Sequence, residues 1–155
     1  MKSNIIFLDV DGVLNYDKYV WEHERAEKIC ICPELAEKVK QFAIRSNSKI
    51  VISSSWRRSD IGMKALQSIY GDLIIGKTTE EPHMSRSIEI ELWWNEHKNE
   101  YNRFVVLDDW DLGFKPGQPF IVVDHMTGIG DQDLVDAMLY LCPEPASNII
   151  KKSNI

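Results

Sequence analysis

The sequence predicts an α/β protein in which helices cover both faces of a mainly parallel five-stranded sheet, a three-layer, Rossmann-like fold. Short apolar runs rich in Ile, Val and Phe alternate with longer segments of helical periodicity, as expected for βαβ units. Two of these runs end directly in acidic residues. The chain has 155 residues, which is the usual length of one domain and enough to bury a core without disulfides.

The first predicted elements flank a polar segment. Residues 4–9 form a strand, because NIIFLD contains four consecutive apolar, β-forming residues. Residues 15–31 are polar and aromatic without a clear period, so we expect a loop or flap with at most a short helix. Pro33 suits the first position of the next helix, and Leu35, Val39 and Phe42 give that helix one apolar face.

The middle of the chain repeats the strand–helix alternation. Residues 49–53 read as the second strand, and Ser59 or Asp60 can cap a helix that stops near Gly71. A short third strand is expected at 73–75. A helix over 85–98 then leads to the acidic end of the next strand.

The last elements complete the predicted sheet. Strands are expected at 104–108 and 120–124, and Asp131 can cap a final helix that carries Leu134, Met138 and Leu141. Residues 1–142 are therefore predicted to form a single domain. The polar stretch 143–155 begins with Pro-Glu-Pro and is predicted to be a tail.

Composition narrows the class of protein. Eighteen basic and 24 acidic residues give a net charge of −6, which argues against a generally basic nucleic-acid binder but allows a local basic patch. The three cysteines, Cys30, Cys32 and Cys142, have no framework spacing, which favours reduced thiols in a cytoplasmic protein. No signal peptide and no apolar run long enough to span a bilayer is apparent, so no membrane partner is expected.

The most informative residues are Asp9 and Asp11, which follow the first strand and precede Gly12. A buried strand that ends in two carboxylates is costly unless something compensates their charge. A bound cation would do so, and so would a reaction that uses one carboxylate as nucleophile and the other as proton donor. The plainer alternative is a turn or capping pair without chemistry.

Several stretches carry a resemblance to a known family. The motif D-x-D-G-V-L follows an N-terminal strand, KIVISSSWR spans 49–57, a basic residue stands at Arg86, and RFVVLDDWD spans 103–111. In this order they resemble the four motifs of the haloacid dehalogenase (HAD) superfamily of phosphohydrolases with an aspartate nucleophile. The combination of ISSSWR, R-x-x-E-I and LDD is most similar to small HAD domains associated with RNA-repair proteins.

The resemblance implies roles for the acidic residues. Asp9 would attack phosphorus to form an aspartyl-phosphate, and Asp11 would protonate the leaving oxygen and later deprotonate water. Mg²⁺ is the implied cofactor, bound by Asp9, the backbone carbonyl of Asp11 and a carboxylate of the second acidic pair, with Asp109 as the main ligand and Asp108 beside it.

The remaining motif residues would hold the phosphate. Ser53 or Ser54 would donate hydrogen bonds to the phosphoryl oxygens, and the run of three serines leaves the register open. Arg86 would balance the charge of the phosphoryl group and of Asp9, with Lys77 as the rival. Trp93, Trp94 and Trp110 are read mainly as packing residues, whereas Trp56 could either stack on a base or be a partly buried residue beside a surface pair of arginines.

Spacing and flanking residues bear on the substrate. About 40 residues separate the first two motifs and about 30 the next two, which leaves no room for the cap domain that larger HAD members insert. Arg57 and Arg58 follow the second motif and could grip a substrate phosphate. The expected substrate is a phosphorylated compound, with a nucleic-acid end or a nucleotide as candidates. The alternative outside enzymes is a HAD-like domain that binds phosphate or a partner without turnover.

Overall fold

A single parallel sheet organises the chain in the computed structural model, which describes residues 1–24, 29–80 and 83–143. The strand order is β3-β2-β1-β4-β5, and every neighbouring pair is parallel. The strands are β1 (Asn4–Leu8), β2 (Ser48–Ile52), β3 (Ile74–Lys77), β4 (Phe104–Asp108) and β5 (Phe120–Val122). The predicted five-stranded α/β fold is therefore confirmed.

The register of the central strands aligns their carboxyl ends. Leu8 pairs with Ile52 of β2 on one side and with Leu107 of β4 on the other. Asp9, Ser53 and Asp108 consequently stand side by side at one edge of the sheet. In open α/β sheets this is the edge at which ligands bind.

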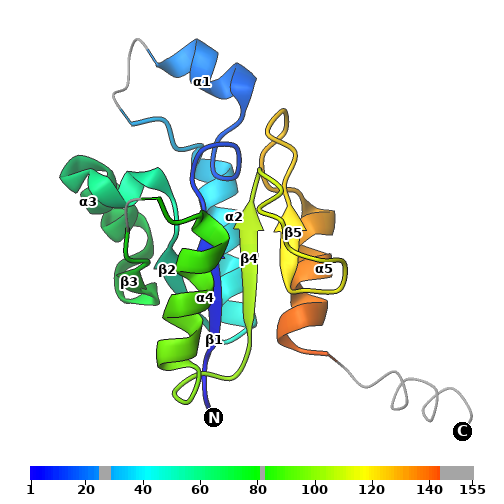
Figure 1. Ribbon diagram of the computed structural model, residues 1–155. Coiled ribbons are helices and arrows are strands. Elements are labelled where there is room, and N and C mark those ends of the chain that lie inside the picture. Colours follow the sequence, from blue (N-terminus) through cyan, green and yellow to red (C-terminus); the bar gives the residue numbers. More distant parts are fainter. Residues whose placement is uncertain (25–28, 81–82, 144–155) are drawn as a thin grey trace, which may run out of the picture.

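Helices cover both faces of the sheet (Figure 1). α2 (Pro33–Arg45), α3 (Asp60–Tyr70) and α5 (Asp131–Leu141) pack on one face around a large apolar core. α4 (Arg86–His97) packs on the other face, where Phe7, Val51 and Val106 of the sheet meet Ile90 and Trp93 of the helix. α4 therefore carries its first residue, Arg86, to the edge at which the strands end.

The helix ends follow ordinary capping chemistry, with one departure from the prediction. Pro33 opens α2, and the side chain of Ser59 accepts a hydrogen bond from the Gly62 amide at the start of α3. The prediction that Asp131 caps α5 is wrong, because the cap is Gly130. Asp131 is the first helical residue. Asp133 accepts a hydrogen bond from the Gly130 amide at 2.8 Å.

The predicted flap contains one short helix, α1 (Asp17–His23), which lies beyond the carboxyl ends of the strands (Figure 1). The base of the flap is tied to the domain: the Cys32 amide donates to the Leu14 carbonyl at 2.8 Å, and His125 contacts Asp17 at 2.9 Å. Residues 25–28 of the flap lie outside the described residues, as do residues 144–155 of the predicted tail.

The described parts of the chain hold no large cap. Between β1 and β2 their helices are α1 and α2, and between β2 and α4 they comprise only the single turns η1 (Ser55–Arg58) and η2 (Gly71–Leu73), helix α3 and strand β3. None of the described helices combines the length and apolarity needed to cross a bilayer.

Candidate active site

Three polar residues follow the apolar residues on the face of the sheet that α4 covers. Side chains alternate along a strand, so Asp9, Ser53 and Asp108 face the same side as Phe7, Val51 and Val106, two positions earlier. This is the side covered by α4, and it places the polar residues directly in front of the first turn of that helix.

The acidic residues at this edge form a tight cluster. One carboxylate oxygen each of Asp9, Asp108 and Asp109 lie within 4.8 Å of one another, and Asp9 and Asp108 are almost fully buried. Burial raises the pKa of Asp9 to about 8, with the charge of Asp108 adding to the effect, Arg86 opposing it, and a hydrogen bond to Asp109 raising it further. Burial also raises the pKa of Asp108.

Arg86 supplies the positive charge of the cluster. Its Nη1 lies 2.8 Å from Asp108 Oδ2 and 3.6 Å from Asp9 Oδ1. Burial alone would lower the pKa of Arg86, but the charges of Asp9 and Asp108 outweigh it and hold that pKa above its ordinary value. The rival residue points elsewhere, because Lys77 Nζ donates to the Arg57 carbonyl at 3.1 Å. The structure thus brings Arg86, rather than Lys77, to the carboxylates.

The turn after β1 orients the second acidic residue of the first motif. Gly12 has a φ of +81°, and its amide donates to Asn15 Oδ1 at 2.8 Å. The Asn15 side-chain amide donates to Asp11 Oδ1 at 3.1 Å, and the Trp56 indole donates to Asp11 Oδ2 at 3.0 Å. These two donors hold the exposed Asp11 carboxylate at the rim of the site, apart from the buried cluster.

Glycine at position 12 also makes room for the second acidic pair. A Cβ at Gly12 would lie only 2.4 Å from Asp109 Oδ2, which no real contact allows. The Asp109 carboxylate therefore packs directly against the backbone of the turn between Asp9 and Asp11. The sequence pattern D-x-D-G requires this glycine both for its backbone angle and for this close approach.

The three consecutive serines occupy three different positions. Ser53 is fully buried, and its hydroxyl makes no hydrogen bond with any described residue. Ser54 accepts a hydrogen bond from the Trp56 amide at 3.1 Å and so caps the turn η1. Ser55 is exposed and lines the pocket.

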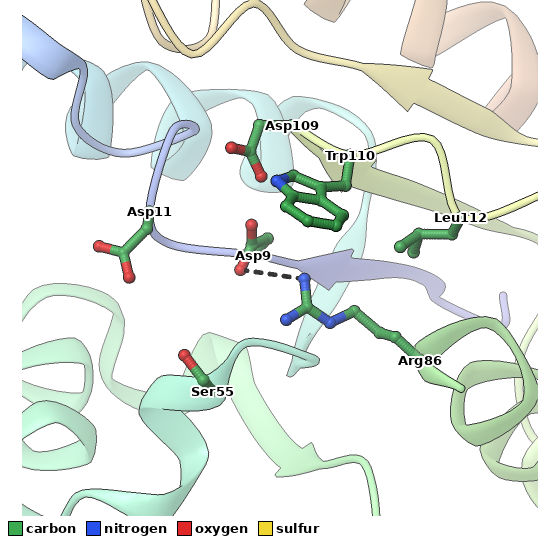
Figure 2. Close-up of a pocket in the computed structure, with 7 residues that line it drawn as sticks. All are labelled: Asp9, Asp11, Ser55, Arg86, Asp109, Trp110 and Leu112. Atoms are coloured by element: carbon green, nitrogen blue, oxygen red, sulfur yellow. Dashed lines mark ion pairs between the residues drawn. The ribbon is translucent and has the colours of Figure 1, made fainter. Parts of the chain in front are cut away.

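A pocket of about 370 Å³ opens above the cluster. Figure 2 shows Asp9 at its floor, Arg86 reaching in from one side, Ser55 on the opposite wall from Asp109, and Asp11 at the edge. The aromatic and apolar part of the wall comes from Trp110 and Leu112, which follow β4. The predicted residues Asp9, Asp11, Arg86 and Asp109 thus converge on one cavity.

Arg57 does not lie at the surface, where a residue that binds substrate is expected. Its side chain is buried and forms a two-point ion pair with Glu89 of α4, at 2.9 and 3.0 Å. Its Nη1 also donates to the Ser53 carbonyl at 2.7 Å. The interpretation of Arg57 as a surface contact for substrate is therefore wrong, because the guanidinium joins the turn after β2 to α4. Arg58 is exposed and pairs with Glu80.

Four residues at the site were not identified from the sequence. Ser55, Trp110 and Leu112 line the pocket, and Asn15 holds the turn that carries Asp11. Trp110 was read as a packing residue, yet it is exposed. Its position directly after an acidic pair at a strand end was the available signal. Asn15 lay in a segment without periodicity and gave no such signal.

The donor set fits a small, hard cation. Carboxylate oxygens of Asp9 and Asp109, with Asp108 beside them, are the ligands that Mg²⁺ prefers. Burial, together with the charge of neighbouring carboxylates, raises the pKa values of Asp9 and Asp108 even with Arg86 in contact, so a bound cation would favour their ionised forms. The two oxygens of Asp108 already accept from Arg86 and from the Trp110 amide, which leaves Asp109 the freer of the two.

Comparison with known proteins identifies the family. Residues 5–134 match the family described as HAD domain in Swiss Army Knife RNA repair proteins. The matched range runs from β1 into α5 and includes every residue of the cluster and the pocket. No curated protein and no solved structure matches the chain.

Proposed function

The chain belongs to the family of HAD domains found in Swiss Army Knife RNA repair proteins, and from that premise we propose that it is a Mg²⁺-dependent phosphohydrolase with Asp9 as its nucleophile. The family supports a HAD-type phosphohydrolase in general terms. The metal, the roles of individual residues and the substrate are our proposal, and each is argued below from the geometry of the site.

In the first proposed step, a carboxylate oxygen of Asp9 attacks the phosphorus of a phosphomonoester. An Asp9–phosphorus bond forms, the bond from phosphorus to the ester oxygen breaks, and Asp11 gives its proton to that oxygen. In the second step, Asp11 takes a proton from water, the water oxygen attacks phosphorus, and the bond to Asp9 breaks. Inorganic phosphate and the alcohol are the products, and Asp9 and Asp11 return to their starting states.

The other residues at the strand ends would bind the phosphoryl group. Arg86 neutralises negative charge beside Asp9, and the unpaired hydroxyl of Ser53 is a donor with no other partner among the described residues. Ser55 adds a hydroxyl at the pocket wall. When bound by Asp9, Asp109, Asp108 and the Asp11 carbonyl, Mg²⁺ would offset the carboxylate charges and draw electron density from the phosphoryl oxygens.

The buried acidic cluster is the observation that carries this proposal. Three carboxylates close together, two of them almost fully buried, destabilise a fold when they are ionised. A domain that binds a partner without turnover needs no such cluster beside an arginine and an exposed carboxylate. Costly groups gathered at the ligand-binding edge of an α/β sheet instead support catalysis.

The test replaces the nucleophile without changing its shape. Asp9→Asn should lower kcat on phosphomonoesters by several orders of magnitude, because the covalent step has no substitute. EDTA should abolish wild-type activity, and Mg²⁺ should restore it. Asp72→Asn, an exposed carboxylate on η2, is the matched control and should keep full activity. Activity of Asp9→Asn above a few per cent would remove Asp9 as nucleophile, and full activity in EDTA would remove the metal.

For the substrate we propose a terminal phosphate on a nucleic acid or nucleotide. The description of the family in terms of RNA repair supports this choice, and so does a pocket that no large cap encloses in the described structure. The exposed Arg58 is the remaining candidate for a contact with the strand. Arg58→Ala and added salt should both reduce kcat/KM on phosphorylated oligonucleotides and leave small phosphate esters unaffected.

A further inference from the structure

A second groove continues from the phosphate pocket toward the flap. It has a volume of about 530 Å³ and shares Asp11, Asp109 and Trp110 with the pocket above Asp9. Its far wall is formed by α1, through Val20 and Trp21. A substrate with its phosphate above Asp9 therefore has one continuous path along which its leaving group can extend.

The flap helix presents an aromatic surface to this groove. None of the residues of α1 is fully buried, and the helix meets the apolar core through the partly buried Tyr19. Trp21 is 78% exposed and Trp110 is 71% exposed, although both indoles line the groove. Two large exposed indoles at one groove beside a reaction site are typical of a surface for stacking on flat ligands.

The charges of the groove exclude a second phosphate. Besides the shared Asp11 and Asp109, it is lined by the carboxylates of Asp17 and Glu24, and its described lining includes no Lys or Arg. His125 is paired with Asp17. Mg²⁺ bound at the cluster would offset the charge of Asp109, but another phosphate beside α1 would still face Asp17 and Glu24 without a basic side chain in the described lining, which is unfavourable. The groove therefore suits a flat chemical group that carries no negative charge.

We propose that this groove, between Trp21 and Trp110, is the subsite for the nucleobase of the nucleotide whose terminal phosphate is hydrolysed. This inference rests on the proposed function and narrows its substrate to a nucleoside monophosphate unit, either free or at the end of a strand. In a strand end, the next phosphodiester leaves the site away from α1.

The first experiment measures the contribution of the base. With Mg²⁺, kcat/KM for adenosine monophosphate should exceed that for ribose 5-phosphate about 10- to 100-fold, which is the range expected for one stacked base. Trp21→Ala should lower kcat/KM for adenosine monophosphate several-fold more than for ribose 5-phosphate, because Trp110 is then the only indole left in the described lining to stack on the base, and Trp21→Phe should keep most of the ratio. Equal losses on both compounds, or a wild-type ratio of 1, would overturn the subsite.

The second experiment tests the charge of the groove. Adenosine diphosphate can place its terminal phosphate above Asp9 only by putting the inner phosphate into the groove, so the wild type should prefer the monophosphate. Glu24→Lys should narrow that preference. Glu22→Lys makes the same change two residues earlier, in α1 and outside the groove lining, and should leave the preference unchanged. An equal effect of both variants, or none, would contradict the charge argument.

Further arms separate the possible failures. If the wild type hydrolyses both compounds equally, the proposed base subsite is refuted, but the proposed phosphatase activity stands. If neither compound and no phosphorylated oligonucleotide is hydrolysed, the proposed phosphatase activity is refuted. Calorimetric titration then tests the subsite, which is supported if adenosine monophosphate binds more tightly than ribose 5-phosphate in a Trp21-dependent way and is refuted otherwise. Comparing the free nucleotide with 3′- and 5′-phosphorylated oligonucleotides shows which source of the nucleotide unit is preferred.

Discussion

Asp9→Asn should make the metal-free protein more stable while it removes activity. The pKa of Asp9 lies at about 8 in the folded protein, against 3.8 ordinarily. Between these values the folded state holds a proton that the unfolded chain has lost, so the free energy of unfolding falls as pH rises through this window. At pH 7, this lowers the stability of the wild type by about 4 kcal/mol relative to a neutral side chain.

The expected gain is somewhat smaller than that difference. An Asn amide at position 9 can donate to the Asp109 carboxylate, but its NH2 group is bulkier than a carboxyl oxygen in this tight cluster, so we expect a net gain of about 2 to 4 kcal/mol at pH 7. For a domain of this size such a gain raises Tm by about 5 to 10 °C. At pH 4 the wild-type carboxyl is protonated in the folded state and about half protonated in the unfolded state, so the gain should nearly vanish.

Urea unfolding in EDTA at pH 4, 5.5 and 7 measures this directly. Asp72→Asn serves as the control, because this exposed carboxylate lies outside the cluster and its replacement should leave stability unchanged at every pH. At pH 7, added Mg²⁺ should raise the free energy of unfolding of the wild type by more than it raises that of the Asp9→Asn variant. A variant as stable as the wild type at pH 7, or one whose gain is equal at pH 4 and 7, would refute the argument that buried charge destabilises the site.

Three further changes probe the rest of the site. Gly12→Ala should weaken Mg²⁺ binding in calorimetric titration, because the new Cβ displaces the Asp109 carboxylate; an unchanged affinity would mean that Asp109 does not bind the ion. Asp109→Ala should lower Mg²⁺ affinity and kcat together, with partial rescue by excess Mg²⁺; loss of kcat at unchanged affinity would assign Asp109 another role. Glu89→Ala should destabilise the fold by about 3 kcal/mol in urea unfolding, because it leaves the buried Arg57 without its partner. The double change Arg57→Met with Glu89→Leu should recover most of that loss, and its failure to do so would show that the pair does more than compensate its own charges.

The sequence predicted the strands well where an apolar run stood alone. The limits expected for the fourth strand, 104–108, coincide with β4, because a run of four apolar residues there is closed by acidic residues. The third strand was placed at 73–75, whereas β3 is Ile74–Lys77. Leu73 belongs to the turn η2, and pairing with β2 carries the strand on through Gly76 and Lys77. Pairing with a neighbour, which no local pattern encodes, decided that boundary.

At the site, the sequence predicted which residues lie at strand ends better than it predicted which side chains contact one another. Asp9 and Asp108 could be brought together because parallel strands end at one edge, whereas Arg86 was placed beside them by the family resemblance. The burial of Arg57 could not be predicted, because its partner Glu89 lies 32 residues further along the chain. The orientation of the three adjacent serines likewise depends on where the turn η1 begins, and each of the three could have capped it.

The attachment of the flap has a consequence for how such a domain can change. The Leu14 carbonyl and the Cys32 amide are joined at 2.8 Å, so the two ends of the intervening segment lie side by side, and Asp17 adds a contact with His125. Lengthening a segment anchored in this way adds little to the free energy of loop closure, about 0.6 kcal/mol for each doubling. β1, β4 and α4, which carry the acidic cluster and its arginine, keep their register whatever that segment contains. Replacing residues 16–29 alone could therefore change the leaving group that the domain accepts without altering the residues that carry out the reaction.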